Sequence, residues 1–353
     1  MQEPYESAFS NDRSRCGCSS CQPPKFWKIF LKDFFLTTFG VSLFVFLCFA
    51  FFGVLAASLS SSVATNLDDK DAFTETVLRG EDDASNLVVV IPIEGEIETE
   101  EDGFIAQVVD SIKEEDNVCA LVLRINSPGG TIAGSDYYRH LFKKLKTELD
   151  IPVVASMGDL TASGGYYIAS VADKIYAERS TLTGSIGVII PMYNGAALCE
   201  KIGVKSSAIT SGPMKGMGNF MKEPTEEETA IWQSLVDDGY EQFLEVVKEG
   251  RPYFQDRDDE LRKIADGRIY TAKQALDLHL VDELGFLDDA IDAAIDASGV
   301  DKNDVQVIRV DEAVGLLDAL GLTVKSKNEP LNKAVDAVAT PRAYYLMPRA
   351  LPL

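Results

Sequence analysis

The chain has 353 residues, of which 56 are acidic and 33 basic, so its formal net charge at neutral pH is −23. No stripe of Lys and Arg is present to neutralise phosphates, which argues against a nucleic-acid-binding protein. The spacing of the six cysteines does not predict a disulfide framework. The length allows one large domain or two modest ones.

The N-terminal part of the chain predicts a membrane anchor. Residues 34–57 carry no charge and are long enough to cross a bilayer with some tilt. Basic residues precede this segment and acidic residues follow it, so the positive-inside rule makes residues 1–33 a cytoplasmic tail. A cleavable signal peptide is the alternative, but its apolar region is usually shorter. We therefore expect a single-pass signal anchor in the cell membrane, with the rest of the chain on the outer side.

Three cysteines, Cys16, Cys18 and Cys21, cluster in the predicted cytoplasmic tail. A structural zinc site takes four ligands, and the tail offers three and no histidine. We expect reduced thiols, with a metal site shared between chains as the alternative. We predict no metal and no cofactor for this chain.

Residues 58–85 are rich in Ser, Asp and Glu and predict a linker, with one short helix around AFTETVLRG (72–80). A strand over 86–97 then begins the main domain, 86–300. Helical and strand-like segments alternate after it: helices are expected over 104–115, 134–149 and 166–172, and strands over 118–126, 152–158 and 174–178. This alternation predicts an α/β fold with a mainly parallel sheet.

Two further helices are expected in the second half of the domain. The clearer one runs from Thr225 to Arg251, and Thr225 and Glu228 have the spacing of a capping box at its start. Its apolar residues can pack on the core or meet a neighbouring subunit. The other helix is expected over 272–285, and residues 301–353 form a C-terminal extension and tail.

Ser163 lies between a strand-like segment and a helical one, and two glycines follow it. Such a turn holds a hydroxyl beside backbone N–H groups, which nucleophilic catalysis on a carbonyl requires. An N-capping serine at a glycine-rich turn is the alternative. A second glycine turn, at Gly129 and Gly130, follows another predicted strand. It can supply an N–H group opposite the one beside Ser163, or serve only as a turn.

A serine nucleophile needs a base, and the two histidines, His140 and His279, lie in helical patterns without turn residues to direct them into a cleft. Lys215 is the remaining candidate, because glycine, proline and methionine surround it in an otherwise acidic chain. Burial beside apolar groups lowers the pKa of a lysine amine, which would let it act as a base. The alternative is a surface lysine on a loop.

Five segments in this order resemble the signal peptide peptidase A family of serine–lysine membrane proteases, in its short, single-copy form: RINSPGG, TASGGYYIA, STLTGSIGVI, TSGPMKG and DGRIYTAKQALDLHLVDELG. The resemblance covers residues 86–300, approximately. It implies that Ser163 is the nucleophile and Lys215 the general base. It also implies that Ser185 orients the lysine, and that Gly129, Gly130 and Gly164 form the oxyanion hole.

The resemblance further implies a crotonase/ClpP-like fold, preceded here by one transmembrane helix. It implies an endopeptidase that degrades signal peptides or membrane-protein fragments rich in apolar and small residues. In short members the lysine comes from an adjacent subunit, which implies a ring-like homo-oligomer. The chain departs from the family at Ala272 and His279, where glycine is common, and these departures concern local packing.

Two other functions remain open at this point: a crotonase-type acyl-CoA enzyme, and a non-catalytic scaffold of a membrane complex. The membrane segment and Lys215 argue against the first. The tail, residues 340–353, has three prolines and an apolar, small-residue character. We expect it to enter an active site, in its own chain or a neighbour.

Overall fold

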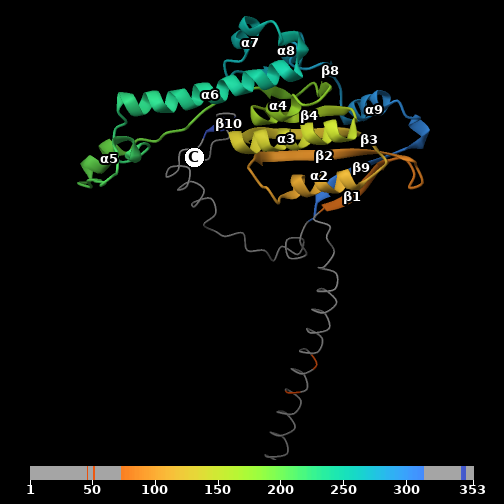
Figure 1. Cartoon of the computed structure of the whole chain (residues 1–353), viewed down its shortest axis with the longest axis horizontal. Coiled ribbons are helices and arrows are strands. Elements are labelled where there is room, and N and C mark those ends of the chain that lie inside the picture. The colour runs from red at the N-terminus through yellow and green to blue at the C-terminus, as the bar shows by residue number, and fades with distance from the viewer. Residues whose placement is uncertain (1–45, 47–50, 52–72, 314–342, 347–353) are drawn as a thin grey trace, which may run out of the picture. The chain divides into compact units, whose positions relative to one another are not determined.

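The computed structural model describes residues 46, 51, 73–313 and 343–346 (Figure 1). The chain divides into two units, residues 1–70 and residues 71–353. In the first unit only Phe46 and Phe51 are described, and both are helical. The rest of the predicted transmembrane segment and the cytoplasmic tail lie outside the described residues. Among the residues that are described, no helix is long and apolar enough to cross a membrane.

The second unit is built on one mixed sheet (Figure 1). Its main strands run in the order β1-β9-β2-β3-β4-β5-β8, while β10 pairs with β3 and β6 pairs with β4 and β7. The strands described are β1 (Phe73–Arg79), β2 (Asn86–Ile97), β3 (Val118–Thr131), β4 (Val153–Ala162), β5 (Lys174–Ala177), β6 (Leu182–Gly184), β7 (Ile269–Thr271), β8 (Glu283–Leu284), β9 (Val305–Glu312) and β10 (Tyr344–Leu346).

The pairing confirms the predicted α/β class with a mainly parallel sheet. The central neighbours β2, β3, β4 and β5 are all parallel, and so are β2–β9, β4–β6 and β5–β8. The antiparallel pairs are β1–β9, β6–β7 and β10–β3. Parallel strands need crossover connections, which the helices provide.

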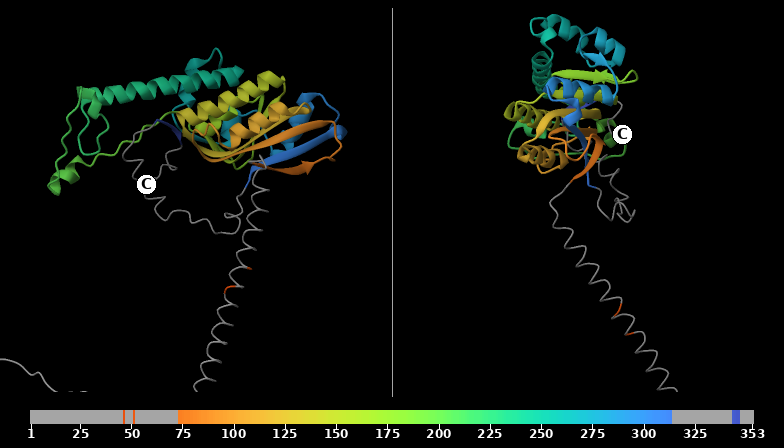
Figure 2. Two further views of the ribbon diagram at one scale, coloured as in Figure 1. Left: turned by 60° about the horizontal axis from the view of Figure 1, so that its bottom comes forward. Right: turned by 90° about the vertical axis from the view of Figure 1, so that its right-hand side faces the viewer.

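Helices cover both faces of this sheet (Figures 1 and 2). The helical segments described are α2 (Phe104–Glu114), α3 (Ile132–Leu149), α4 (Gly164–Ala169), α5 (Ala196–Lys201), η1 (Pro213–Gly216), α6 (Glu226–Gly250), η2 (Pro252–Phe254), α7 (Asp258–Ile264), α8 (Ala272–Asp277), α9 (Leu287–Ser298) and η3 (Lys302–Asp304).

The central strands are apolar at consecutive positions because they are buried on both faces. On β2, Val89 and Ile91 belong to the larger core, which they share with residues of α2, α3, α4 and α6. Val88 and Val90 belong to a second core on the other face, where α9 contributes Ile291 and other residues. Residues i and i+2 thus share a face, as the pleat requires.

Most of the predicted local elements are confirmed. The strand at 86–97 has the predicted bounds, and the other elements agree with their predicted positions to within a few residues. The capping box is present: Thr225 Oγ1 accepts a bond from the N–H of Glu228, and a Glu228 carboxylate oxygen accepts one from the N–H of Thr225. Helix α6, of 25 residues, therefore begins where the sequence indicates.

Two local predictions are wrong. The short helix expected within the linker is the strand β1, which pairs with β9 far along the chain. Every side chain of β1 after Phe73 is exposed, so no buried face distinguishes a strand from a helix, and only the distant partner decides between them. The helix expected over 272–285 ends at Asp277, because His279 has a left-handed backbone with φ 59°. Residues 283–284 then form β8.

The sheet extends into both flanking segments. Strand β1 lies in the segment predicted as linker, and β9 and β10 lie in the predicted C-terminal extension. Strand β9 pairs with β2, so it is an inner strand of the sheet. The folded domain therefore includes residues on both sides of 86–300.

Candidate active site

Ser163 stands where β4 ends and α4 begins. Its N–H donates to the carbonyl oxygen of Gly184 at 2.8 Å, and its own carbonyl accepts from the N–H of Tyr167 at 2.9 Å. These bonds hold a backbone with φ 53° and ψ −116°, outside the usual regions for a residue with a Cβ. Strain of this kind persists only where the surroundings impose it, and it is concentrated at functional sites.

The hydroxyl of Ser163 is buried, and Oγ has no hydrogen-bond partner among the described residues. It does not accept a bond from the first turn of α4, so the N-cap alternative is not supported. A buried polar atom without a partner costs about 1–3 kcal/mol. The hydroxyl is therefore in the environment expected of a reacting group and not in that of a structural cap.

The glycine turn at the end of β3 lies against this serine. Gly129 has φ 103°, which favours glycine. A Cβ at Gly129 would lie 2.7 Å from the backbone nitrogen of Gly164 and would collide with the carbonyl oxygen of Tyr345. A Cβ at Gly164 would lie 3.1 Å from the nitrogen of Gly130. The backbone nitrogens of Gly130 and Gly164 thus lie close to one another, next to the nucleophile candidate.

The three predicted oxyanion glycines do not have equal roles in this geometry. The N–H of Gly129 donates to Oγ of Ser127 at 3.1 Å, which engages it within the protein. Gly164 is the first residue of α4, and the N–H of a first helical residue has no acceptor within its helix. Gly130 and Gly164 are therefore the better donors, while Gly129 provides the space that a side chain would fill.

Strand β10 runs along this turn, far from it in sequence. Tyr344, Tyr345 and Leu346 pair antiparallel with Thr131, Gly130 and Gly129, in that order. On its other edge, Tyr344 exchanges two backbone hydrogen bonds with Ile189, of 2.9 and 3.0 Å. An extended segment held on both edges, with a carbonyl beside the glycines, has the placement that a peptide substrate would need.

Ser185, the third predicted side chain, is buried at the end of β6. Its backbone is also left-handed, with φ 50°, and its N–H donates to the carbonyl of Arg268 at 2.8 Å. Ser185 lines a cavity of about 480 Å³ that also contains Tyr240 and Leu346. Leu346, which follows the two tyrosines of β10, therefore lines the same cavity as Ser185.

The structure does not place Lys215 in this cavity. Lys215 lies in η1. This helix is part of a segment, residues 190–224, that we call the arm. The arm includes α5 and projects at the N-terminal end of α6 (Figure 2). Lys215 is exposed, and its side chain has no hydrogen bond or ion pair with any described residue. This single chain does not provide the burial beside apolar groups that was expected for Lys215.

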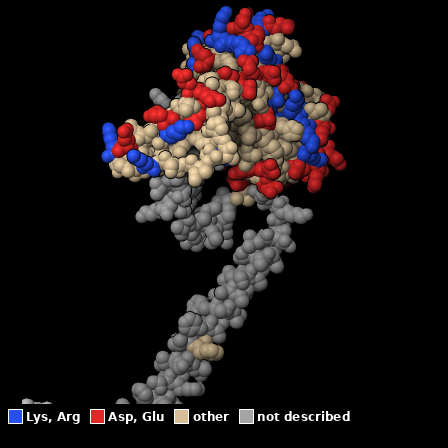
Figure 3. All heavy atoms as spheres, turned by 60° about the vertical axis from the view of Figure 1, so that its left-hand side comes forward, with Lys and Arg blue, Asp and Glu red and all other residues tan. Residues whose placement is uncertain are grey.

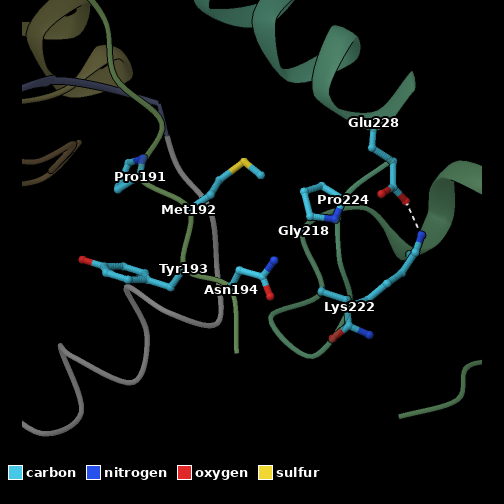
Figure 4. Close-up of a pocket in the computed structure, with 10 residues that line it drawn as sticks. Pro191, Met192, Tyr193, Asn194, Gly218, Lys222, Pro224 and Glu228 are labelled. Carbon is cyan, nitrogen blue, oxygen red and sulfur yellow. Dashed lines mark hydrogen bonds and ion pairs between the residues drawn. The ribbon is translucent and has the colours of Figure 1, made fainter. Parts of the chain in front are cut away.

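The arm is anchored to the start of α6. Lys222 Nζ donates to Glu228 Oε1 at 2.7 Å (Figure 4), and the N–H of Gly195 donates to the carbonyl of Phe220 at 2.8 Å. Hydrogen bonds from Lys222 and from the backbone of Thr225 hold the pKa of Glu228 below its usual range. These bonds fix the loop that carries Lys215 without bringing it toward Ser163.

Neither histidine contacts Ser163. His140 is exposed on α3, and the ring of His279 stacks on Tyr253 with 3.9 Å between centroids. The backbone of His279 is left-handed, with φ 59°, a conformation that suits the glycine that the family resemblance implies for this position. Ala272, the other departure, is fully buried, and its N–H donates to the carbonyl of Thr181 at 2.9 Å.

Sequence reasoning missed the residues around the β10 tyrosine. Tyr167 and Phe243 pack on the Tyr345 ring, and Ser127 engages the N–H of Gly129. Tyr167 and Phe243 were expected only as members of helices. No local sequence pattern connects Tyr167 and Phe243 with β10, because the position of β10 depends on its pairing with β3.

Comparisons with known proteins show the family of this chain. Residues 145–301 match the family model described as peptidase family S49. A putative protease of Synechocystis sp. is 42% identical over 208 residues, which cover 59% of this chain and 73% of that protein. The chain belongs to peptidase family S49. It is therefore a peptidase, as the sequence motifs imply.

A second relative is a putative signal peptide peptidase SppA of Enterococcus faecium, 40% identical over 190 residues that span 54% of each chain. Among solved structures, a membrane-bound stomatin-specific protease in complex with a substrate peptide aligns with 68% of this chain and 97% of its own. Its sequence identity is 19% and its TM-score 0.41. The sequence match with the Enterococcus faecium protein spans only about half of that protein's length.

Proposed function

We propose that this peptidase is a membrane-anchored serine endopeptidase with Ser163 as nucleophile and Lys215 as general base. The observation that carries the proposal is the Ser163 hydroxyl, which is buried and unpartnered among the described residues on a strained backbone. It lies next to the glycines along which β10 runs. A hydroxyl in this setting is suited to attack a carbonyl presented by an extended peptide.

The N–H groups of Gly130 and Gly164 bind the oxyanion in this mechanism. The carbonyl of Tyr345 lies beside Gly129, where a substrate carbonyl would meet both groups. Pre-oriented N–H donors stabilise the developing negative charge, and loss of one such donor typically slows catalysis by about 10²–10³-fold.

Lys215 acts on the Ser163 of a neighbouring copy. The arm carries the lysine away from its own α4, and several of its apolar side chains are exposed: Leu198, Ile202, Val204, Ile209 and Met221. Figure 3, which brings this side forward, shows uncharged side chains over much of the face, with charged groups mainly at its margins. Packing of such arms between copies would form a ring-like homo-oligomer and would bury the lysine.

Ser185 then orients the incoming amine. Its cavity of about 480 Å³ has room for a side chain, and no lysine is among the residues that line it. Burial there would disfavour the charged amine and lower its pKa. A neutral amine within reach of Ser185 and Ser163 can accept a proton.

The reaction proceeds in two halves. Lys215 takes the proton of Ser163 as Oγ forms a bond to the substrate carbonyl carbon, and the amine then protonates the leaving nitrogen as the C–N bond breaks. Water next attacks the acyl carbon, with the amine as base. The C–Oγ bond then breaks, the amine returns the proton to Oγ, and the carboxylic acid leaves. The residues named supply every proton transfer.

The substrates we propose are peptides rich in apolar and small residues, such as signal peptides and membrane-protein fragments. The apolar surroundings of β10 support this class, since Tyr345 and Leu346 are both buried there. The predicted segment 34–57 would hold the peptidase at the cell membrane, with its catalytic unit on the outer side.

Complementation between inactive variants tests the shared dyad. Ser163→Ala and Lys215→Ala should each lower peptide hydrolysis by at least about 10³-fold. Mixed oligomers of the two should recover part of the activity, because some sites then combine an intact serine with an intact lysine. Lys205→Ala, on the same arm, is the control and should hydrolyse peptides like the wild type.

Two results would contradict the proposal. Full activity of Ser163→Ala would remove the serine from the mechanism. No recovery in oligomers shown to contain both variants would place the dyad within one chain.

A further inference from the structure

We propose that Thr161 and Thr183 are positioning residues, whose hydroxyls fix the two strand ends that carry Ser163 and Ser185. This inference rests on the proposed function and adds two residues to its site. Each threonine stands two residues before one of these serines, and both threonines are fully buried. The two serines thus share one local arrangement, in which a buried threonine and a small residue precede the serine.

Both serines have a backbone that needs support from its surroundings. Ser163 has φ 53° and Ser185 has φ 50°, in a region that residues with a Cβ seldom adopt. Such conformations persist only where the neighbouring structure imposes them. The strand ends that lead into the two serines are therefore the places where additional hydrogen bonds are needed.

The hydroxyl of Thr161 joins β4 to β3 where the regular pairing of these strands is interrupted. Ile125 pairs with Met157 and Ser127 with Thr161, so residues 158–160 have no paired residue in β3. Across this irregularity, Thr161 Oγ1 donates to the carbonyl oxygen of Ile125 at 2.7 Å. Strand β3 then continues into the glycine turn. The bond therefore fixes the strand that leads to the nucleophile against the strand that carries the oxyanion glycines.

The hydroxyl of Thr183 extends this connection to β6. Thr183 Oγ1 donates to the carbonyl oxygen of Thr161 at 2.6 Å, and the two threonines are opposite one another in the parallel pairing of β4 and β6. Strands β3, β4 and β6 are thus joined by two consecutive side-chain hydrogen bonds. Because both bonds are buried, removal of a hydroxyl leaves a carbonyl without that donor and without water to replace it.

Displacement of these strand ends should affect catalysis more than substrate binding. A shift of about 1 Å in the position of a reacting group can slow a reaction by about 100-fold. Strand β10, which has the placement that a peptide substrate would need, is paired with β3 and with Ile189. Its pairing does not involve β4 or β6. We therefore expect the two hydroxyls to influence kcat and to leave KM nearly constant.

Thr→Val changes test the hydroxyls, because valine keeps the branched shape and removes the donor. In the full-length chain, Thr161→Val and Thr183→Val should each lower kcat for peptides about 10–100-fold and change KM by less than about threefold. Thr161→Ser and Thr183→Ser retain the hydroxyl. These conservative variants should keep kcat within about threefold of the wild type, because the hydrogen bond can still form.

Thr181 provides a matched control. It is equally buried, and its Oγ1 donates to the carbonyl oxygen of Gly158 at 2.6 Å, but it lies before the first residue of β6. Thr181→Val removes the same kind of bond, so it should lower Tm about as much as the other two valine changes do. Its kcat should stay within about twofold of the wild type, because its bond lies farther from both serines along the chain.

Amide hydrogen exchange measures the positioning without catalysis. The N–H groups of the two serines are both hydrogen-bonded to backbone carbonyls in the folded protein. Mass spectrometry of peptides that cover residues 160–167 and 182–189 reports how often these bonds open. Exchange there should be about tenfold faster in Thr161→Val and Thr183→Val than in Thr181→Val, because only the first two changes loosen the strand ends.

An equal fall of kcat in all three valine variants would overturn the inference. An unchanged kcat in Thr161→Val and Thr183→Val would also overturn it, and so would a serine variant as slow as its valine counterpart. Failure of the proposed function is a different result, because peptide hydrolysis would then persist in Ser163→Ala. The difference in hydrogen exchange between the valine variants does not depend on that outcome.

Discussion

The buried hydroxyl of Ser163 makes an unusual prediction: removal of the nucleophile should stabilise the protein. Oγ is buried and has no partner among the described residues. Ser163→Ala removes that unsatisfied group and leaves the neighbouring backbone bonds to Gly184 and Tyr167 in place. The gain in the free energy of unfolding should be about 1–2 kcal/mol, the lower part of the cost of a buried unsatisfied polar group.

The comparison is made on the Lys215→Ala background, between Lys215→Ala and the double variant Ser163→Ala, Lys215→Ala. Both should be inactive, and in neither can the amine of a neighbouring copy bind the hydroxyl. Thermal unfolding of each full-length chain in one detergent would be followed by circular dichroism. For a domain of this size, 1 kcal/mol moves Tm by about 2–4 °C, so we expect a difference of about 2–8 °C in favour of the double variant.

A matched serine controls for the loss of a hydroxyl in general. Ser127 is equally buried, but its Oγ accepts a bond from the N–H of Gly129 at 3.1 Å. Ser127→Ala should therefore lower the free energy of unfolding by about 1 kcal/mol. If the double variant unfolds at a lower temperature than Lys215→Ala, the hydroxyl has a stabilising partner other than the lysine and the reasoning is refuted.

Two further predictions follow from the same site and from the arm. Gly129→Ala should lower kcat/KM for peptides by at least about 100-fold, since its Cβ would strike the substrate carbonyl beside Gly164; a loss below threefold would exclude this placement. Glu228→Gln should destabilise the protein at pH 7, because the pKa of Glu228 is lowered by bonds from Lys222 and Thr225. A group with a lowered folded-state pKa stabilises above its unfolded pKa and loses that contribution as the pH falls through its folded pKa. Urea unfolding should therefore show a gap between wild type and variant that closes in acid; a gap independent of pH would contradict the assignment.

Local patterns in the sequence are enough to predict the elements that depend on neighbouring residues. Alternation of apolar segments predicted the α/β class, and the pair Thr225 and Glu228 predicted where α6 begins. The serine and glycine pattern at Ser163 predicted a sharp strand-to-helix turn, and the backbone there is left-handed. These features are local because periodicity, capping and glycine conformations are each set within a few residues.

The contacts between residues far apart in the sequence depend on the tertiary structure. The sequence of β1 suits a helix until β9 pairs with it, and nothing near Tyr345 indicates that it lies opposite Gly130. Likewise, the motif around Lys215 suggested a base, while only the arm shows that this lysine is exposed and outside the cavity of Ser185. Contacts across about 200 residues leave no periodicity in the sequence, because they form only when the core brings the segments together.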